Sequence, residues 1–469
     1  MHACGPWRGS GMKDISRVME GGYCIGCGAC PFVDPSISMV MDDDGKYQAK
    51  PGASEPSDKA NACCPFANAR LNEDVLGKRL FGSIDGIQHD SATGYYLENY
   101  AGYVTADGYR DRGSSGGMVS WLAAKLLETG KVDAVLHVKP AEDESVMYEY
   151  RVSTSVEELK EGAKSKYYPI ELSEVLQYVA DHDGRYAVIG IPCFIKAMRL
   201  VEQEDEVIAA RVRYHLGLVC GHLKSTFFAL SEAWESGIPL QDIRMVDFRY
   251  KLPGRKATDY GIQATGVVDG KTVTVTKPTR ELSTTNWGYG YFKYNACEYC
   301  DDVLAETADI TCGDAWLPQY AKDGQGTNVV VVRSLEMKEL LERFADEIHL
   351  EAISADVVAQ SQGSGLRHRR EGTSYRLYLK DQAGEWRPTK RVKPSNRIPH
   401  WRKAVYRERL ELVRQSFIGF HLAERSPQGM QAFNEHMAPY LKRYKRADNP
   451  WYRRVGKKAK QLVRRVLGK

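Results

Sequence analysis

The pattern of hydrophobic and polar residues changes about 80 residues into the chain. Before that point the segments are short, turn-rich and rich in cysteine, and SISMVMDDDGKYQAKP alternates apolar and polar positions around a DDDG turn. This alternation predicts a β-hairpin. We expect the stretch that follows, GASEPSDKANA, to be a loop leading into CCPF.

From about residue 81 onward, helical and strand patterns alternate. GMVSWLAAKLLETGK has apolar residues at helical spacing and a glycine stop, and VDAVLHV follows it as an apolar run. The same order of a helix followed by a strand is predicted twice more. The helices are SEVLQYVADHDGR and FIKAMRLVEQ, and the strands that follow them are YAVIGIPC and RYHLGLVCG. Further strands are predicted at DIRMVDFRYK, KTVTVTKP, DITCGDAW and TNVVVVRS, and a helix at SLEMKELLERF. The alternation predicts an α/β (α+β) core with a mixed, partly parallel sheet.

Basic charge is concentrated towards the C-terminus. Residues 400–469 hold 18 Lys and Arg against 5 Asp and Glu, a net charge of +13, so the rest of the chain carries −9. NPWYRRVGKKAKQLVRRVLGK is predicted to be a basic amphipathic helix. Its apolar face would hold Val455, Ala459, Leu462, Val463 and Val466. We expect this tail to bind an anionic membrane surface or to be a solvated terminal helix.

Other global features narrow the functional class. The start, MHACGPWRGSGMKD, has no apolar stretch of a secretory signal, and no apolar run approaches the roughly 18 residues of a membrane span. We therefore expect a cytoplasmic protein, peripheral at the inner face of the membrane if the tail binds lipid. Eleven cysteines in a reducing compartment favour metal or redox chemistry over disulfides. The acidic body argues against nucleic acid as a partner.

The first cysteine motif is C-x2-C-x2-C, formed by Cys24, Cys27 and Cys30. Three thiolates at this spacing, with glycines between them, are typical of a 4Fe-4S cluster, and a zinc site is the alternative. We choose Cys64 as the fourth ligand because Pro65 follows it, as in ferredoxin-type runs. Its neighbour Cys63 would then be a buried thiol, although the pair could both be buried thiols.

A second set of four cysteines is dispersed. Cys193 and Cys220 each follow a predicted strand, and Cys297 and Cys300 form a CEYC pair at ligand spacing. Together they could hold a second cluster, but lone cysteines at strand ends are more often small core residues. We expect the leftover cysteines to be structural; these are Cys4, Cys63 and Cys312.

A glycine- and serine-rich turn precedes the helix that begins near residue 118. Glycines permit close approach of the backbone, serines offer hydroxyls, and a helix N-terminus offers N–H groups to a diphosphate. The alternative is an ordinary capped turn. The residues concerned are Gly113, Ser114, Ser115, Gly116 and Gly117.

Seven motifs follow one another in an order that is similar to that of one protein family. They are GSSGG (113–117), KSKYY (164–168), IPC (191–193), GLVCGH (217–222), DFRYKLPG (247–254), CEYC (297–300) and CGDAW (312–316). Over roughly residues 20–370 the chain resembles the family of coenzyme F420 hydrogenase/dehydrogenase beta subunits, which includes bacterial proteins encoded among polysaccharide-synthesis enzymes.

The resemblance implies FAD, two 4Fe-4S clusters and, as a further candidate, coenzyme F420. It makes the dispersed cysteines expected ligands of the second cluster. It also supports a ferredoxin-like segment over residues 1–80 and a flavin-binding domain over 81–370. The remaining residues, 371–469, are expected to form a linker and the basic helical tail.

Further cofactor contacts are hypotheses of the same kind. Ser165, Lys166 and Tyr167 in KSKYY could contact the flavin or a phosphate, although most lysines are simply exposed. Arg249, Lys251, Asn295, Asp314 and Trp316 are further candidates, with strand-edge or core roles as their alternatives. We do not choose a proton donor between His215 and His222.

We therefore predict an iron–sulfur flavoprotein oxidoreductase. Electrons would enter from a ferredoxin-type donor, pass through both clusters to FAD and reduce an organic substrate. By resemblance to the polysaccharide-locus proteins, that substrate would be a sugar or a lipid-linked glycan. The alternative is an electron-transfer subunit that exchanges electrons with coenzyme F420 or a partner chain. A zinc-stabilised nucleic-acid-binding protein is the least favoured class.

Overall fold

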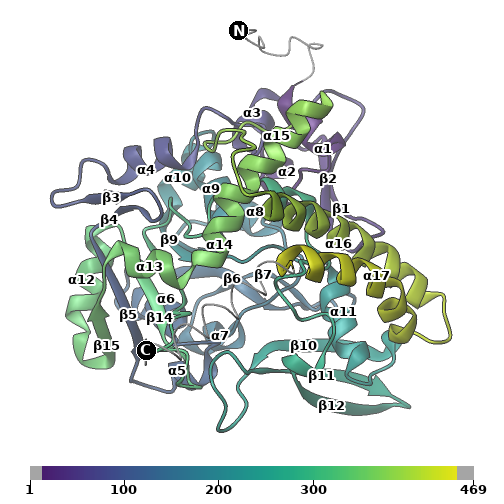
Figure 1. Ribbon diagram of the computed structural model, residues 1–469. Helices are drawn as coiled ribbons and strands as arrows, with labels where there is room; N and C mark the ends of the chain where they lie inside the picture. The colour runs from purple at the N-terminus through teal and green to yellow at the C-terminus, as the bar shows by residue number, and fades with distance from the viewer. Residues whose placement is uncertain (1–12, 451–469) are drawn as a thin grey trace, which may run out of the picture.

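An eight-stranded mixed sheet forms the centre of the computed structural model, which describes residues 13–450 (Figure 1). In spatial order its strands are β15 (Ile348–Ala352), β5 (Glu98–Val104), β14 (Asn328–Val332), β13 (Ile310–Asp314), β9 (Val212–Leu218), β8 (Tyr186–Gly190), β6 (Ala134–Pro140) and β7 (Tyr148–Ser153).

The middle of this sheet is parallel, and both of its sides are antiparallel. β13, β9, β8 and β6 pair in parallel, whereas β14, β5, β15 and β7 join antiparallel. The predicted α/β fold with a partly parallel sheet is confirmed. All five residues of β14 are buried, as expected for a strand covered on both faces.

Helices cover both faces of the sheet. α6 (Met118–Glu128) and α12 (Leu335–Arg343) share a core with Val135 and Leu216, while α8 (Ser173–Asp181) and α9 (Pro192–Val201) share another with Leu136 and Val188. Val135 and Leu136 are adjacent on β6, so successive side chains of one strand enter opposite cores. Shorter helices between these strands are α5 (Tyr109–Arg112), α7 (Val156–Glu161) and α10 (Glu206–Arg211), and two more follow β15, namely α13 (Ala355–Ser361) and α14 (Gly363–Arg367).

The predicted N-terminal hairpin is confirmed. β1 (Ile37–Met41) and β2 (Tyr47–Pro51) pair antiparallel, and the Asp42 carboxylate accepts hydrogen bonds from the backbone N–H groups of Asp44 and Lys46 across the turn. The prediction of a loop after it is wrong in part, because α3 (Asp58–Cys63) begins there. The Ser57 hydroxyl caps this helix by accepting a hydrogen bond from the N–H of Ala60, 3.1 Å away. Six residues are too few to show helical periodicity in the sequence.

The N-terminal segment and the body share one hydrophobic core. Ile15 of α1 (Asp14–Glu20), Ile25 and Phe66 belong to the same cluster as Leu172 and Phe194 of the body. α2 (Ala29–Val33) contacts both α8 and α9, and α4 (Glu73–Phe81) then leads to the small β3 (Gln88–Asp90) and β4 (Gly94–Tyr96) pair. The cysteine-rich segment is therefore held directly against the helices of the main sheet.

Three C-terminal helices also pack on the body. Figure 1 shows α16 (His400–Glu424) and α17 (Met430–Asp448) side by side near α11 (Thr226–Glu235), above the sheet of β10 (Ile243–Tyr250), β11 (Gly261–Val268) and β12 (Lys271–Pro278). Phe420 stacks on Phe227 with ring centroids 4.1 Å apart. α15 (Thr373–Ala383) lies nearer the cysteine-rich segment. The basic helix predicted near the C-terminus falls outside the described residues, and none of the helices that are described is long and apolar enough to cross a membrane.

Candidate metal centres and cofactor site

Four cysteines of the N-terminal segment line a single small cavity, which we name the N-terminal cavity. They are Cys24, Cys27, Cys30 and Cys64. Cys63 is fully buried but does not line it, and its thiol donates a hydrogen bond to the carbonyl of Ala60 at 3.3 Å. The geometry therefore brings together the four residues chosen from the sequence.

The glycines of this motif are needed for its shape. Gly26 and Gly28 have φ values of +69° and +77°, which favour glycine, and a Cβ on Gly26 would lie 2.5 Å from the carbonyl oxygen of Tyr47. The resulting turn directs the N–H groups of Gly26 and Ala49 to the sulfur of Cys24, at 3.3 and 3.4 Å. Such N–H donors stabilise negative charge on a thiolate.

The four dispersed cysteines line a second small cavity, the central cavity. Cys193 lies in the first turn of α9, directly after Pro192, and Cys220 lies two residues beyond β9. Cys297 and Cys300 come from the 3-10 helix η3 (Asn295–Tyr299) and its C-cap. The sulfur of Cys297 accepts a hydrogen bond from the N–H of Leu223 at 3.3 Å. The fold thus gathers residues more than a hundred positions apart around one space.

Burial controls the protonation of these thiols. It raises the pKa of Cys64 to about 11 and that of Cys220 to about 12, and it raises the pKa of Cys24, Cys193 and Cys300 as well. The thiols are therefore neutral near pH 7 unless a cation stabilises the thiolate form. Metal binding supplies that stabilisation and displaces the protons.

The four cysteines of each cavity are the donor set that a 4Fe-4S cluster uses. A tetrahedral zinc site, the alternative, would need sulfurs about 2.3 Å from one ion. Among residues 13–450, no three or more His, Cys, Asp or Glu side chains converge closely enough to hold one metal ion. The ligand assignments themselves stay predictions.

The two cavities share a wall. Ile25 and Phe66 line both of them, and these side chains are 5% and 3% exposed. Arg369, in the π-helical segment His368–Gly372, also lines the central cavity. Sequence reasoning missed all three because no spacing rule links an apolar wall residue, or an arginine from another segment, to a cysteine motif.

The glycine- and serine-rich turn and the KSKYY segment lie together. The Ser114 hydroxyl accepts a hydrogen bond from the N–H of Ser165 at 2.8 Å, and the two hydroxyls are 3.2 Å apart. Arg249 donates to the carbonyl of Ser114 at 3.2 Å and to both carboxylate oxygens of Asp314 at 3.0 Å. It also reaches the Tyr167 hydroxyl at 3.4 Å. The Nε atom of Arg249 is buried without a hydrogen-bond partner, which leaves one donor for a bound group.

Part of this turn is explained by packing alone. A Cβ on Gly116 would lie 2.7 Å from the carbonyl oxygen of Gly102, and one on Gly117, at φ +83°, would lie 2.6 Å from Tyr109. Gly113 donates its N–H to the Tyr109 carbonyl, and the Ser115 hydroxyl donates to the Thr327 carbonyl. These four residues therefore fix the start of α6 against the sheet, and Ser114 is the member of the turn that faces Arg249.

The other candidates divide into two groups. Lys251 donates to the carbonyls of Arg110, Ser115 and Gln325, and Trp316 lies 5.5 Å from the Arg249 guanidinium, so both belong to this site. Lys166 instead contacts the Ala163 carbonyl and the Tyr148 ring, and burial lowers its pKa to about 8. Asn295 donates to the Gly22 carbonyl and so connects η3 to the N-terminal segment.

Trp287 connects the Arg249 site to the central cavity. Its ring lies 4.7 Å from Tyr167 and 4.6 Å from His222, and a Cβ on Gly221 would lie 3.1 Å from it. The Nε2 atom of His222 is buried and has no hydrogen-bond partner. His215, by contrast, pairs with Glu202 at 2.6 Å inside the core and is structural. Sequence reasoning missed Trp287, for which the aromatic-rich run before CEYC was the available signal.

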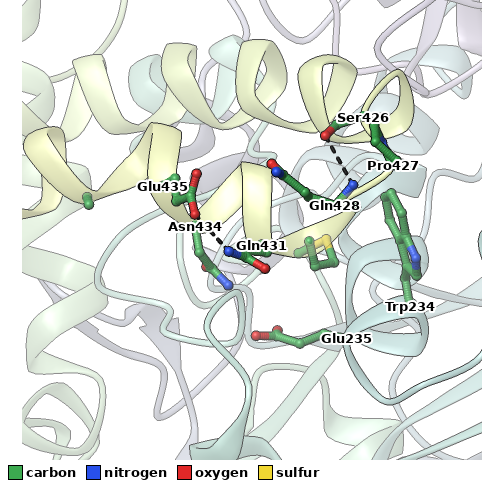
Figure 2. A pocket seen from close by; sticks show the side chains of 11 residues that line it. Trp234, Glu235, Ser426, Pro427, Gln428, Gln431, Asn434 and Glu435 are labelled. Carbon is green, nitrogen blue, oxygen red and sulfur yellow. Dashed lines mark hydrogen bonds between the residues drawn. The ribbon is translucent and has the colours of Figure 1, made fainter.

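A separate hollow lies on the surface at the turn between α16 and α17. Figure 2 shows Trp234 and Glu235 facing Gln428, Gln431 and the residues around them. It contains none of the residues predicted from the sequence and is open to solvent. The chemistry is therefore assigned to the cysteine cavities and the Arg249 site.

Comparison with known proteins identifies the family. A profile described as the N-terminal part of the coenzyme F420 hydrogenase/dehydrogenase beta subunit matches residues 99–177, and the profile of its C terminus matches residues 183–357. Together they cover more than half of the chain. The chain belongs to this family.

Two curated proteins are similar to this member of the coenzyme F420 hydrogenase/dehydrogenase family. One subunit of the F(420)H(2) dehydrogenase of Methanosarcina mazei is 21% identical over 348 residues, which are 72% of this chain and 86% of the relative. The coenzyme F420-dependent sulfite reductase of Methanocaldococcus jannaschii is 22% identical over 418 residues, or 81% of this chain. The chain spans 59% of that reductase.

Among solved structures, one chain of the F420-reducing [NiFe] hydrogenase complex of Methanosarcina barkeri is similar, with a TM-score of 0.47 and 17% identity. The match covers 62% of this chain and 96% of that one. All four central-cavity cysteines lie within the matched C-terminal part of the family, whereas the four N-terminal ones precede both matched ranges.

Proposed function

We propose that the protein is an iron–sulfur flavoprotein oxidoreductase that passes electrons from a ferredoxin-type donor, through two 4Fe-4S clusters and FAD, to an organic substrate. The observation that carries the proposal is the pair of four-cysteine cavities with a common wall of Ile25 and Phe66. Two cysteine-lined cavities in contact suit electron transfer from one cluster to the next. A protein with a single structural metal site would need only one such cavity.

The residues around each cavity support cluster binding. Eight cysteines would supply the thiolates, and the N–H groups of Gly26, Ala49 and Leu223 already point at ligand sulfurs. Apolar side chains such as Ile25 and Phe66 exclude water, which protects a cluster and sets its potential.

The flavin site is proposed between the Ser114 turn, Arg249 and Trp287. Arg249 would donate through its unpartnered Nε, and the Ser114 and Ser165 hydroxyls would orient a phosphate or ring oxygen. Trp287 would offer a flat apolar surface between this site and the central cavity. FAD bound there would supply the exchange between one-electron and hydride chemistry.

Cofactor analysis after anaerobic purification tests the proposal. We expect about eight iron atoms and eight sulfides per chain, as two 4Fe-4S clusters require, together with one extractable FAD and little zinc. A colourless protein without flavin absorbance would refute the proposal. Stoichiometric zinc without sulfide would instead support a structural metal protein.

An electron-transfer subunit that exchanges electrons with coenzyme F420 is the second candidate. It is favoured by the two curated relatives, both of which are named for F420. The loaded protein would reduce F420 with reduced ferredoxin, or with an artificial donor, and would not need an organic substrate. Turnover of F420 by the isolated chain supports this candidate, and turnover of an organic compound without F420 supports the first.

The substrate class and cellular location are further parts of the proposal. A sugar or lipid-linked glycan is the substrate suggested by the family resemblance, with the protein acting in the cytoplasm and the basic C-terminal segment bringing it to an anionic membrane surface. Co-sedimentation with vesicles containing phosphatidylglycerol, using the full chain and a chain ending at residue 451, tests the membrane contact. Equal partitioning of the two would remove that contact from the proposal.

A further inference from the structure

The central and N-terminal cavities differ in the charged groups that line them. The lining of the N-terminal cavity contains no charged side chain, whereas Arg369 and Asp302 line the central cavity. Both cysteine sets are buried, so desolvation acts on both. The difference in fixed charge therefore decides which of the two sites holds an added electron more favourably.

Arg369 is a buried cation directed at the central cavity. Its side chain donates to the carbonyl of Cys297 at 2.9 Å and to the carbonyl of Gly221, which follows Cys220. Both acceptors are neutral, so these contacts do not cancel its charge. The residue is 4% exposed. A guanidinium in the cavity lining stabilises additional negative charge in the cavity.

The local backbone positions this side chain. Arg369 lies in the π-helical turn His368–Gly372, between the helices α14 and α15. A π-turn inserts an extra residue and changes the direction in which side chains point, and such turns are frequent at functional sites. Within the same turn, Arg370 pairs with Glu306 instead.

The carboxylates near the central cavity form ion pairs or accept backbone hydrogen bonds. Asp301 pairs with Lys390 at 3.8 Å and with Arg391 at 3.6 Å. The carboxylate of Asp302 accepts hydrogen bonds from the N–H groups of Leu304 and Glu306, at 2.8 and 3.0 Å. Two cations therefore oppose Asp301, and two backbone N–H groups satisfy the carboxylate of Asp302.

The N-terminal cavity has an acidic neighbour instead. A Cβ on Gly28, which lines this cavity, would lie 2.0 Å from a carboxylate oxygen of Glu171. Glu171 accepts hydrogen bonds from the N–H and hydroxyl of Ser173, at 2.6 and 2.9 Å. A carboxylate beside Gly28, in the wall of the cavity, disfavours added negative charge on the N-terminal side.

Lys390 lies between the two sites. Its ammonium is 4.0 Å from the centroid of the Phe66 ring, and Phe66 belongs to both cavity walls. Its charge acts on Cys64 of the N-terminal set and on Cys300 of the central set. Lys390 therefore acts on both cysteine sets, whereas Arg369 lines only the central cavity. A variant of Lys390 can be compared with a variant of Arg369 to separate these two effects.

We propose that Arg369 gives the central cluster a higher reduction potential than the N-terminal cluster, so that electrons run from the N-terminal site to the central site and on towards the Arg249 site. This inference rests on the proposed function, since it requires a cluster in each cavity. One electron is gained by the central cluster and lost by the N-terminal cluster, and the external donor restores the latter. Arg369 acts on the reduction potential of the central cluster through its positive charge.

Potentiometric titration of the anaerobically purified full chain, followed by electron paramagnetic resonance, tests the inference. Cys27→Ala and Cys220→Ala variants assign each signal to its cavity. In the wild type we expect the central midpoint to be the higher one. Arg369→Met should shift the partition of one electron between the clusters about tenfold towards the N-terminal cluster, about 59 mV for a one-electron couple. Arg369→Lys, which keeps the charge, should retain the wild-type order.

Matched variants separate a specific effect from a general loss of charge. Arg367→Met and Lys393→Met remove exposed cations close in sequence and should leave the difference between the midpoints unchanged. Lys390→Met should lower both midpoints together. Equal or reversed midpoints in the wild type, or an unchanged difference in Arg369→Met, would overturn the inference.

The outcomes also separate this inference from the function on which it depends. Absence of both cluster signals in the wild type contradicts the proposed function. Two clusters with the wrong order contradict only the role of Arg369. If Arg369→Met fails to load the central cluster, the wild-type order and the Arg369→Lys variant decide the inference.

Discussion

At the scale of single residues, the choice between adjacent cysteines is the sharpest prediction. Cys64→Ala should lose the N-terminal cluster and about half of the iron, because only one member of the pair lines the cavity. Cys63→Ala should keep its iron, since that thiol is directed at the carbonyl of Ala60. Iron and sulfide analysis measures both. Full iron content in Cys64→Ala with loss in Cys63→Ala would reject the assignment.

Arg249 is the residue on which the proposed flavin site depends. Arg249→Gln should weaken FAD binding by about tenfold to a hundredfold, because hydrogen bonds to a charged donor contribute about 1.5–3 kcal/mol. Fluorescence titration of the apoprotein with FAD measures the affinity. Arg244→Gln, on the exposed side of the same strand, is the matched control and should bind FAD as the wild type does. Unchanged affinity in Arg249→Gln would place the flavin elsewhere.

The same scale shows what the sequence could and could not predict about the site. Cys24, Cys27, Cys30 and Cys64 could be proposed from local spacing, whereas the dispersed cysteine set and Ser114 needed the family resemblance as well. Arg369 and Lys390 could not be proposed, since each reaches its cavity from a segment with no motif of its own. At Gly116 and Gly117 the backbone of Gly102 and Tyr109 fills the space where a Cβ would lie, so packing accounts for these glycines, and a cofactor role for them stays a prediction.

At the scale of elements, periodicity predicted the central helices and strands because each pattern is complete within one segment. α6, α9 and the strands β6, β8 and β9 lie where the alternation placed them. Strand order was beyond reach, since β5 pairs with β14 and β15 from more than two hundred residues away. α3 was missed because its start depends on the Ser57 cap and is too short for a periodic signal.

The helix α16 offers a test of how the C-terminal helices contribute to stability. Phe420 is fully buried and stacks on Phe227 of α11, so Phe420→Ala should lower the free energy of unfolding by about 3–5 kcal/mol. Leu422, two residues further along the helix, is 48% exposed. Leu422→Ala should therefore change the free energy of unfolding by about 0.5 kcal/mol or less. Urea unfolding followed by circular dichroism measures both. Similar effects of the two variants would mean that α16 does not pack as described.

At the scale of the whole molecule, the fold arranges three sites in series. The N-terminal cavity meets the central cavity at Ile25 and Phe66, and the central cavity meets the Arg249 site through Gly221, His222 and Trp287. The N-terminal segment shares its hydrophobic core with α8 and α9. The contact between the N-terminal and central cavities is therefore fixed and does not depend on transient docking of two domains. The order of the sites along this series has a kinetic consequence.

Removing the first site should separate two kinds of electron donor. Cys27→Ala should abolish flavin reduction by ferredoxin, because electrons would lose their entry site, while a small artificial donor that reaches the flavin directly should still reduce it. Cys63→Ala, which removes a buried thiol outside the cavity, is the control and should keep both activities. Stopped-flow measurement of flavin bleaching with each donor gives the two rates. If Cys27→Ala accepted electrons from ferredoxin at the wild-type rate, entry would occur at the central cavity, and the serial arrangement would not be the route that electrons follow.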